Sequence, residues 1–325
     1  MTQPEIIKGK GFEKVDRQKF GHEHLLGTKN LSKDEIEIIL DLADYYADRL
    51  DDKAFKPDIL RGNIILSLFF EDSTRTRTSF EMAAKRLGAE WINIDIAHSS
   101  VKKGESLLDT VLTLDAMLRP DAIIMRHKEF AAPDFIAGHV NCPVVNAGDS
   151  WREHPTQALL DALTIRRHKG KIEGLNIAIC GDVAHSRVAS SNMDTLVKLG
   201  ANVRVIAPPL LMPKKLPHDS IQMFTSMEEG LKDCDIVMML RLQKERMEEA
   251  EIPSEESFFA DYGLTLERLD MAKPDALVMH PGPMNRNVEI ADEVADDPQR
   301  SLILSQVRNG VPTRMAVLDL LLKRV

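Results

Sequence analysis

The fold of this chain can be inferred from the stretch IILSLFFEDSTRTR, which occupies residues 64–77. Its first half is an apolar run with the length and composition of a buried β-strand. A polar turn follows, and a helical pattern then extends from about Thr76 to Leu87, where Gly88 predicts the end of the helix. A buried strand that leads directly into a helix is the repeating unit of an α/β fold with a parallel sheet.

The same alternation continues on both sides of this stretch. Upstream, Ser32 and Glu35 fit a capping box, and the apolar spacing from Ile36 to Tyr46 predicts a helix. Downstream, we expect strands at Trp91–Ile96, Ala122–Met125 and Pro143–Asn146 and helices at Glu105–Leu118 and Phe130–His139. These elements predict a first domain with helices on both faces of a parallel sheet.

A second series of strands and helices follows a long amphipathic helix at His154–His168. We expect strands at Leu175–Cys180, Val203–Ala207, Ile221–Phe224, Ile236–Leu240 and Ala276–Met279 and helices at Arg187–Leu199 and Val311–Leu322. The predicted fold class is therefore α/β, with two doubly wound parallel-sheet domains joined by helices. The predicted domains are residues 1–153 with about 300–325, onto which the last helix packs, and residues 154–299.

Composition sets the broad class of protein. The chain has 325 residues, a length that predicts two domains. Hydrophobic residues make up 43% and charged residues 29%, a balance typical of a globular protein. Its net charge of −9 argues against a general affinity for nucleic acid or for anionic membranes. Three widely spaced cysteines give neither a disulfide framework nor a metal motif, and no stretch fits a signal peptide or a membrane span. We therefore expect a cytoplasmic protein.

The densest chemical signal is Ser73-Thr74-Arg75-Thr76-Arg77, between the first buried strand and its helix. Ligands of such sheets bind beyond the carboxyl ends of the strands. Hydroxyl groups and backbone N–H groups at a helix N-terminus attract anions, and the interleaved arginines add donors suited to phosphate. A well-capped helix with solvated arginines is the structural alternative. The concentration of donors after a buried strand favours a phosphate site.

This segment and two others together resemble a known family. Phe69–Arg77 is similar to the carbamoyl-phosphate motif of the aspartate/ornithine carbamoyltransferases, and HPTQ at residues 154–157 resembles their HPxQ element. Arg126 resembles their second phosphate-binding arginine. The order and spacing agree with the family from about residue 20 onward. The resemblance implies that carbamoyl phosphate is bound through its phosphate by Ser73, Thr74, Arg75, Thr76, Ser99, Lys103 and Arg126.

The resemblance also assigns roles around the carbonyl group of carbamoyl phosphate. It implies that Thr76, Arg126 and His154 stabilise the negative charge that develops on the carbonyl oxygen, and that Gln157 binds the carbamoyl amino group. A single histidine at the start of a helix is more often structural, so the role of His154 depends on the resemblance.

The loop Ser99–Ser106 resembles the mobile loop of family members that use aspartate. In those members a serine and a lysine reach the active site of the neighbouring subunit, and by position these residues are Ser99 and Lys103. The alternative is a solvated basic loop before a helix. The resemblance implies a homotrimer with shared active sites, and it leaves open whether regulatory chains or a dihydroorotase-type partner join the trimer.

The second domain carries arginines after two of its predicted strands. Arg241 and Gln243 resemble the family's RxQ element, which holds the side-chain carboxylate of aspartate, and Arg187 matches the arginine that holds the α-carboxylate. Two arginines suit a dicarboxylate because each can bind one carboxylate through two hydrogen bonds, whereas ornithine would need an acidic partner. HPGP at residues 280–283 lacks the cysteine of ornithine enzymes. It implies substrate contacts at Gly282 and Pro283, although some family members carry a bulkier apolar residue in place of Gly282.

The resemblance implies an enzyme that transfers the carbamoyl group of carbamoyl phosphate to the α-amine of L-aspartate. The products would be N-carbamoyl-L-aspartate and phosphate, an early step of de novo pyrimidine synthesis. The implied reaction needs neither a metal nor a cofactor. Cys180–His185 follows a strand but lacks the glycines of a dinucleotide site. The alternatives are a carbamoyltransferase for ornithine or a related amine and a non-catalytic scaffold paralogue. The expected catalytic residues are Arg75, Thr76, Lys103, Arg126 and His154.

Overall fold

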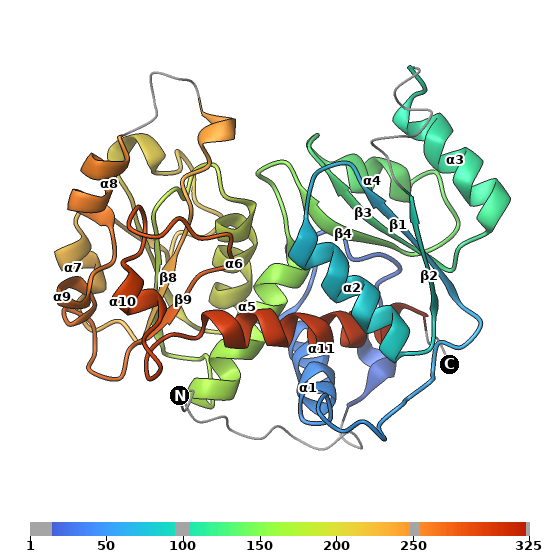
Figure 1. The fold of residues 1–325 in the computed structure, drawn as a ribbon, viewed down its shortest axis with the longest axis horizontal. Helices are drawn as coiled ribbons and strands as arrows, with labels where there is room; N and C mark the ends of the chain where they lie inside the picture. The colour runs from blue at the N-terminus through green and yellow to red at the C-terminus, as the bar shows by residue number, and fades with distance from the viewer. Residues whose placement is uncertain (1–14, 95–103, 248–253, 323–325) are drawn as a thin grey trace. The chain divides into compact units, whose positions relative to one another are not determined.

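The computed structural model describes residues 15–94, 104–247 and 254–322, drawn in colour in Figure 1. The chain divides into two compact units. The described residues up to Leu160, together with those from Asn309 onward, form the N-terminal unit, and Asp161–Arg308 form the C-terminal unit. Each unit contains one parallel β-sheet, so the predicted fold class, two parallel-sheet α/β domains, is confirmed.

The N-terminal unit is built on a four-stranded parallel sheet with the strand order β2-β1-β3-β4. Its strands are β1 (Ile64–Phe69), β2 (Glu90–Ile94), β3 (Ala122–His127) and β4 (Val144–Asp149). The middle of β1 is buried, and Leu68 pairs with Met125 of β3 in the core. Burial of each such side chain contributes about 1.5–3 kcal/mol, which explains why an uninterrupted apolar run forms the central strand.

The helices of this unit start where the sequence offers suitable caps. They are α1 (Lys33–Ala47), α2 (Thr74–Arg86), α3 (Leu107–Leu118) and α4 (Ala132–Ala137), preceded by the short 3₁₀ turn η2 (Arg17–Lys19). The predicted capping box at α1 is confirmed, because the Ser32 hydroxyl accepts from the Glu35 amide at 3.2 Å and the Glu35 carboxylate accepts from the Ser32 amide at 2.9 Å.

The C-terminal unit is built on a five-stranded parallel sheet with the strand order β7-β6-β5-β8-β9. Its strands are β5 (Asn176–Cys180), β6 (Asn202–Ile206), β7 (Gln222–Phe224), β8 (Ile236–Met239) and β9 (Leu277–Met279). Its helices and 3₁₀ turns are α6 (Arg187–Lys198), η5 (Pro209–Leu211), α7 (Met227–Leu231), η6 (Lys244–Arg246), α8 (Glu255–Tyr262), α9 (Leu266–Leu269) and α10 (Asp292–Ala295). All five expected strands are present, and their ends agree with the expected ones or differ by one residue.

Two long helices, α5 (Pro155–Lys169) and α11 (Ile303–Leu322), each contain a boundary between the units. The boundaries fall after Leu160 and Arg308, whereas the sequence placed them after residue 153 and near residue 300. The expected start of the last helix at Val311 was wrong, because α11 begins at Ile303 and continues through Gly310 and Pro312. Both residues disfavour a helix interior, and packing outweighs that local preference.

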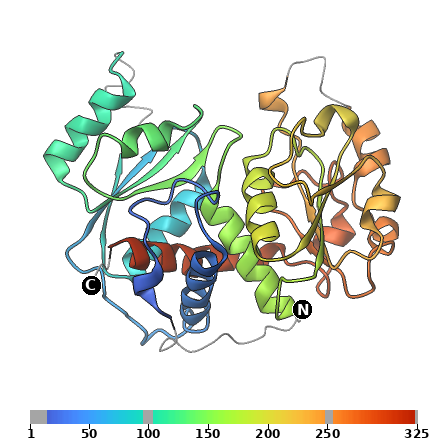
Figure 2. The same cartoon turned by 180° about the vertical axis from the view of Figure 1, so that it is seen from behind.

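The C-terminal part of α11 belongs to the N-terminal unit and packs beside α1, as both views show (Figures 1 and 2). The Tyr46 hydroxyl of α1 donates to the buried carboxylate of Asp319 at 2.7 Å, and Arg17 pairs with the same carboxylate at 2.6 Å. These contacts hold the end of α11 against α1 and η2 of the N-terminal unit. Among the described helices, none is both long and apolar enough to cross a membrane.

Candidate active site

The N-terminus of α2 follows β1 directly and carries the expected phosphate-binding residues. Ser73 is the N-cap residue of α2, yet its side chain makes no capping hydrogen bond. By contrast, the serines that precede α1, α3, α6 and α8 each accept a hydrogen bond from a first-turn amide. The first turn of α2 is therefore served by neither its serine nor an acidic side chain, and it is suited to bind an anion.

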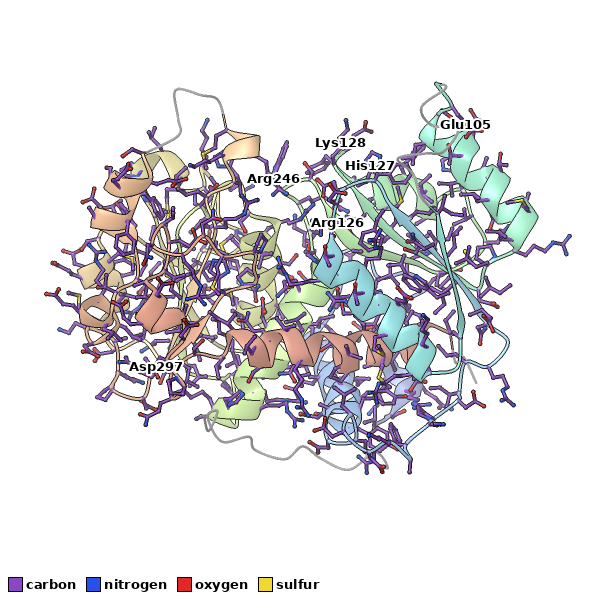
Figure 3. The ribbon with its side chains drawn as sticks, in the orientation of Figure 1. Glu105, Arg126, His127, Lys128, Arg246 and Asp297 are labelled. Atoms are coloured by element: carbon purple, nitrogen blue, oxygen red, sulfur yellow. The ribbon has the colours of Figure 1, made fainter. Side chains whose placement is uncertain are left out.

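Arg126 lies near the carboxyl end of β3, where it pairs with Phe69 of β1 (Figure 3). Its Nη1 donates to the carbonyl oxygen of Ala147 at 3.3 Å. Its Nε lies 3.2 Å from the carboxylate of Glu71, which follows β1. The guanidinium is therefore held at the same sheet edge as the start of α2, with Glu71 balancing its charge.

His154 lies immediately before α5, and its backbone carbonyl accepts a hydrogen bond from the backbone N–H of Gln157 at 2.9 Å. Its Nε2 lies 3.5 Å from the hydroxyl of Thr76, and both side chains are buried. Thr76 and His154 thus follow β1 and β4, and Arg126 lies near the end of β3, the strand between those two. The structure brings together, within one unit, the groups that the sequence assigned to the carbonyl oxygen.

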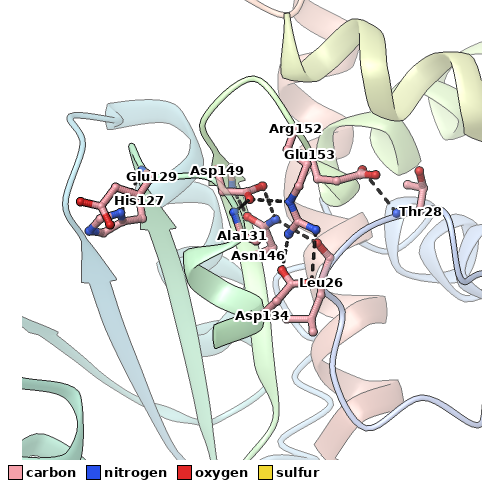
Figure 4. A network of polar contacts seen from close by, with 11 residues as sticks. Leu26, Thr28, His127, Glu129, Ala131, Asp134, Asn146, Asp149, Arg152 and Glu153 are labelled. Atoms are coloured by element: carbon pink, nitrogen blue, oxygen red, sulfur yellow. Dashed lines mark hydrogen bonds and ion pairs between the residues drawn. The ribbon is translucent and has the colours of Figure 1, made fainter. Parts of the chain in front are cut away.

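The loop that carries His154 is fixed by a network of polar contacts around Asp149, the last residue of β4 (Figure 4). The fully buried carboxylate of Asp149 accepts from Arg152 at 2.6 Å, from the Asn146 amide group at 2.7 Å and from the backbone N–H of Ala131 at 2.9 Å. Because hydrogen bonds to a charged group are strong, this network restricts the path from β4 to His154.

Arg152 forms a second ion pair, with the carboxylate of Asp134 in α4. Burial alone would lower the pKa of Arg152, but the carboxylates of Asp149 and Asp134 hold that pKa above its usual value. The arginine therefore links the His154 loop to α4 as a permanent cation.

In the C-terminal unit, the expected aspartate-binding residues also follow adjacent strands. Arg187 is the first residue of α6 after β5, and it is almost fully buried. Arg241 follows β8, and its Nη2 donates to the side-chain oxygen of Gln243 at 3.1 Å. The Gln243 side chain donates in turn to the Arg241 carbonyl at 3.2 Å, so the two side chains orient each other.

Asp182 connects these two strand ends and was not assigned a role from the sequence. Its fully buried carboxylate accepts from the Gln243 backbone N–H at 3.0 Å and lies 2.8 Å from His185 Nδ1. The His185 carbonyl accepts from Arg246 at 2.8 Å. Asp182 therefore ties the segment after β5 to the segment that presents Arg241.

Gly282 and Pro283 follow β9, which neighbours β8 in the sheet. Gly282 has φ +65° and is joined to Pro283 by a cis peptide bond. A φ in the left-handed region favours glycine over residues with a side chain, so the backbone conformation at this position suits Gly282. The expected residues Ser99 and Lys103 lie outside the described residues.

Sequence reasoning missed Glu71 and Asp182, although both stand inside the motifs that were analysed. The signal that could have found them is a carboxylate directly after a buried strand, next to predicted cationic ligands. Within the described part of the chain, no group of three or more histidine, cysteine or acidic side chains is arranged to hold a metal ion.

The fold is that of a two-domain α/β protein, with an N-terminus of α2 that its serine does not cap in one unit and two arginines after adjacent strands in the other. Residues 23–167 match the carbamoyl-phosphate-binding domain of aspartate/ornithine carbamoyltransferases, and residues 173–321 match the aspartate/ornithine-binding domain. The chain belongs to the aspartate/ornithine carbamoyltransferase family.

Among its relatives, the aspartate carbamoyltransferase catalytic subunit of Rhodospirillum centenum is 56% identical over 306 residues, which cover 94% of this chain and 96% of the relative. Aspartate transcarbamoylase from Trypanosoma cruzi, solved with carbamoyl phosphate, has a TM-score of 0.83 and 32% identity over 92% of this chain and 96% of that chain. Ornithine carbamoyltransferase from Pyrococcus furiosus has a TM-score of 0.84 and 27% identity over 93% of this chain and 98% of that chain. The fold is thus common to both enzymes, while sequence identity favours the aspartate enzymes.

Proposed function

We propose that this chain is an aspartate carbamoyltransferase, which transfers the carbamoyl group of carbamoyl phosphate to the α-amine of L-aspartate. The reaction yields N-carbamoyl-L-aspartate and phosphate, an early step of pyrimidine synthesis, in the cytoplasm. The observation that carries the proposal is the alignment of Thr76, Arg126 and His154 along three adjacent strand ends, next to the uncapped terminus of α2.

The phosphate of the donor binds at the start of α2. Ser73, Thr74 and Arg75 supply hydroxyl, backbone and guanidinium donors, and the helix terminus adds a partial positive charge of roughly +0.5. Arg126 binds the phosphate and the carbonyl oxygen, which requires it to exchange part of its contact with Glu71 for the ligand. Gln157, in the first turn of α5, binds the carbamoyl amino group.

The chemistry is attack of the uncharged aspartate amine on the carbonyl carbon of carbamoyl phosphate. Negative charge grows on the carbonyl oxygen, and Thr76, Arg126 and His154 stabilise it. The C–O bond to phosphate then breaks, and the departing phosphate accepts the proton from the nitrogen. Placing both substrates together contributes about 7–11 kcal/mol at most to lowering the barrier.

Aspartate binds through its two carboxylates. Arg187 holds the α-carboxylate, Arg241 and Gln243 hold the side-chain carboxylate, and the backbone at Gly282 and Pro283 completes the contact. The proposal requires both units to reach the same pair of substrates. Ornithine would place an ammonium group beside Arg241, and like charges repel, so the aspartate reaction is favoured.

Ser99 and Lys103 act in the active site of a neighbouring subunit, so the functional form is a homotrimer. The test mixes two inactive variants, Lys103→Ala and Arg75→Ala, under conditions in which subunits exchange. Hybrid trimers contain sites with both residues intact and should regain activity. If exchange is demonstrated and no activity returns, sharing of the sites is refuted.

The test of the function itself is a product assay with the purified protein. We expect N-carbamoyl-L-aspartate from carbamoyl phosphate and L-aspartate, and little or no citrulline when L-ornithine replaces aspartate. A faster reaction with ornithine than with aspartate would show that the chain is an ornithine carbamoyltransferase instead. The absence of carbamoyl transfer to any amine would support a scaffold protein instead.

A further inference from the structure

A buried acid–base pair lies beside the Gly282–Pro283 turn and has no role in the chemistry above. His280 follows β9, and Glu289 lies in the segment between the turn and α10. Both side chains are fully buried, with His280 Nε2 3.0 Å from Glu289 Oε1. Burying an ionisable pair costs free energy that an apolar pair would not, so its presence calls for an explanation.

The contacts of His280 fix which ring nitrogen carries the proton. The Gly282 backbone N–H donates to His280 Nδ1 at 2.9 Å. An amide can only donate, so Nδ1 must be the unprotonated nitrogen, and Nε2 must donate to Glu289. The ring therefore bridges the backbone of Gly282 to a buried carboxylate.

Glu289 closes the turn from its other side. Its Oε1 accepts from the Asn285 backbone N–H at 2.5 Å as well as from His280. One carboxylate oxygen thus joins residues before and after Gly282 and Pro283. Its Oε2 is buried and makes no hydrogen bond to the described residues. Burying this second oxygen costs free energy, and only the contacts of Oε1 offset that cost.

The same histidine is anchored toward the helices of its unit. Gln306 accepts from the His280 backbone N–H at 2.8 Å and donates to the buried carboxylate of Asp161 at 2.8 Å. Asn192 of α6 donates to that carboxylate at 2.8 Å. Since α6 begins with Arg187, a chain of buried hydrogen bonds connects the turn to the helix that presents a carboxylate-binding arginine.

We infer that His280 and Glu289 are positioning residues that hold the Gly282–Pro283 backbone in its substrate-binding conformation. The inference rests on the proposed function, in which this turn contacts the substrate. The turn and its support lie entirely in the C-terminal unit, whereas the phosphate-binding residues lie in the N-terminal unit. The pair therefore supports the use of aspartate without affecting the binding of carbamoyl phosphate.

Two substitutions of His280 separate its two contacts. In His280→Asn, the side-chain oxygen takes the place of Nδ1 and can still accept from Gly282. In His280→Gln, the side-chain amide takes the place of Nε2 and can still donate to Glu289, but the bond to Gly282 is lost. We expect His280→Gln to raise the KM for aspartate about ten-fold, the equivalent of one lost hydrogen bond, and His280→Asn to change it less than three-fold.

The readouts separate positioning from general loss of structure and from failure of the proposed function. The affinity for carbamoyl phosphate, measured by calorimetry, should match wild type in both variants, and hydrogen exchange should accelerate at residues 280–285 in His280→Gln only. Equal KM values for aspartate in wild type and His280→Gln would overturn the inference, as would a parallel loss of carbamoyl phosphate binding. Inactive wild-type protein would instead refute the proposed function. The hydrogen-exchange measurement would still test whether His280 holds the Gly282–Pro283 turn in place.

A second variant keeps the test decisive if His280→Gln does not fold. Glu289→Met has a similar volume but cannot accept from His280 or Asn285. We expect Glu289→Met to raise the KM for aspartate and to leave the binding of carbamoyl phosphate unchanged. Glu289→Gln can still accept both hydrogen bonds, so we expect it to restore the KM for aspartate to near the wild-type value. Failure of Glu289→Gln to restore it, or unchanged kinetics in Glu289→Met, would overturn the inference.

Discussion

Arg126 Nε lies 3.2 Å from Glu71 Oε2, with both side chains partly buried beyond the carboxyl ends of β3 and β1. The pair holds the guanidinium at the edge of the sheet where we propose that phosphate binds. An incoming phosphate must therefore compete with a carboxylate for the same cation, and the two negative charges repel each other.

Removing the charge of Glu71 should strengthen binding of phosphate. We expect Glu71→Gln to lower the Kd for inorganic phosphate, because the amide keeps the volume but no longer competes for Arg126. Arg126→Met should raise that Kd about 10- to 100-fold, since hydrogen bonds to charged groups contribute about 1.5–3 kcal/mol each. Calorimetric titration measures both. Weaker phosphate binding in Glu71→Gln would show that the pair organises the site instead of competing with the ligand.

His154→Ala should reduce kcat more than it weakens the binding of carbamoyl phosphate. The reason is that a donor to a developing oxyanion acts mainly in the transition state, and its loss reduces kcat about 10²- to 10³-fold. Steady-state kinetics with calorimetry of the donor distinguish the two effects. The matched control is His139→Ala, because His139 is exposed on the surface of the same unit. A variant with normal kcat and weak donor binding would contradict the oxyanion role.

Arg241→Ala should impair the use of aspartate alone. We expect the KM for aspartate to rise at least about ten-fold, since one carboxylate loses its paired donors, while the Kd for carbamoyl phosphate stays within two-fold. The control is Arg61→Ala, which removes an exposed arginine that pairs with Asp58 on the surface. Unchanged kinetics with aspartate in Arg241→Ala would exclude this arginine from the site.

Stability should fall in mild acid through His127. Burial lowers the pKa of His127 below its ordinary value, against the opposing effect of Glu129 and Glu71. The folded state therefore binds fewer protons than the unfolded state. The contribution of His127 to the free energy of unfolding is then fully present above a pH of about 6.5 and decreases as the pH falls below that value.

The test compares the free energies of urea unfolding of wild type and His127→Asn at pH values of about 7.5 and 5.5. Asparagine can still accept the hydrogen bond that the Glu129 backbone N–H donates to His127 Nδ1 at 3.0 Å, but it does not titrate. The loss of stability between the two pH values should therefore be smaller in the variant. An equal loss of unfolding free energy in both proteins would show that His127 does not contribute to the acid sensitivity.

The three thiols should be unreactive in the native protein. Burial raises the pKa of Cys142 to about 12 and that of Cys234 to about 11, and it raises the pKa of Cys180 well above its usual value. Since only the thiolate reacts, a thiol reagent at a pH of about 8 should label no cysteine rapidly, and it should label all three after denaturation. Rapid labelling of native protein would contradict the burial of these side chains.

The regular elements could be predicted because burial leaves a local pattern in the sequence. The apolar run from Ile64 identified β1 to within one residue of its end, and Ser32 with Glu35 marked the start of α1. The start of α11 at Ile303 could not be found, since Gly310 and Pro312 oppose a helix locally and only packing with distant residues stabilises it.

The partners of the supporting acidic residues could not be predicted for the same physical reason. Glu71 was visible as a residue, but its partner Arg126 is 55 positions away and meets it only through the pairing of β1 with β3. Asp182 likewise meets Gln243 through the pairing of β5 with β8. Sequence motifs therefore identified groups suited to bind substrates, and the structure was needed to find the groups that hold them.

The missing side-chain cap at Ser73 has a consequence for the lifetime of the protein. An N-cap hydrogen bond contributes about 0.5–2 kcal/mol, and the Ser73 side chain does not make one to the first turn of α2. Any ligand that binds only the folded form protects it from unfolding in proportion to its concentration. Scarcity of the phosphorylated donor would therefore slow the reaction and also expose the chain to proteolysis, so metabolic supply and enzyme abundance would decline together.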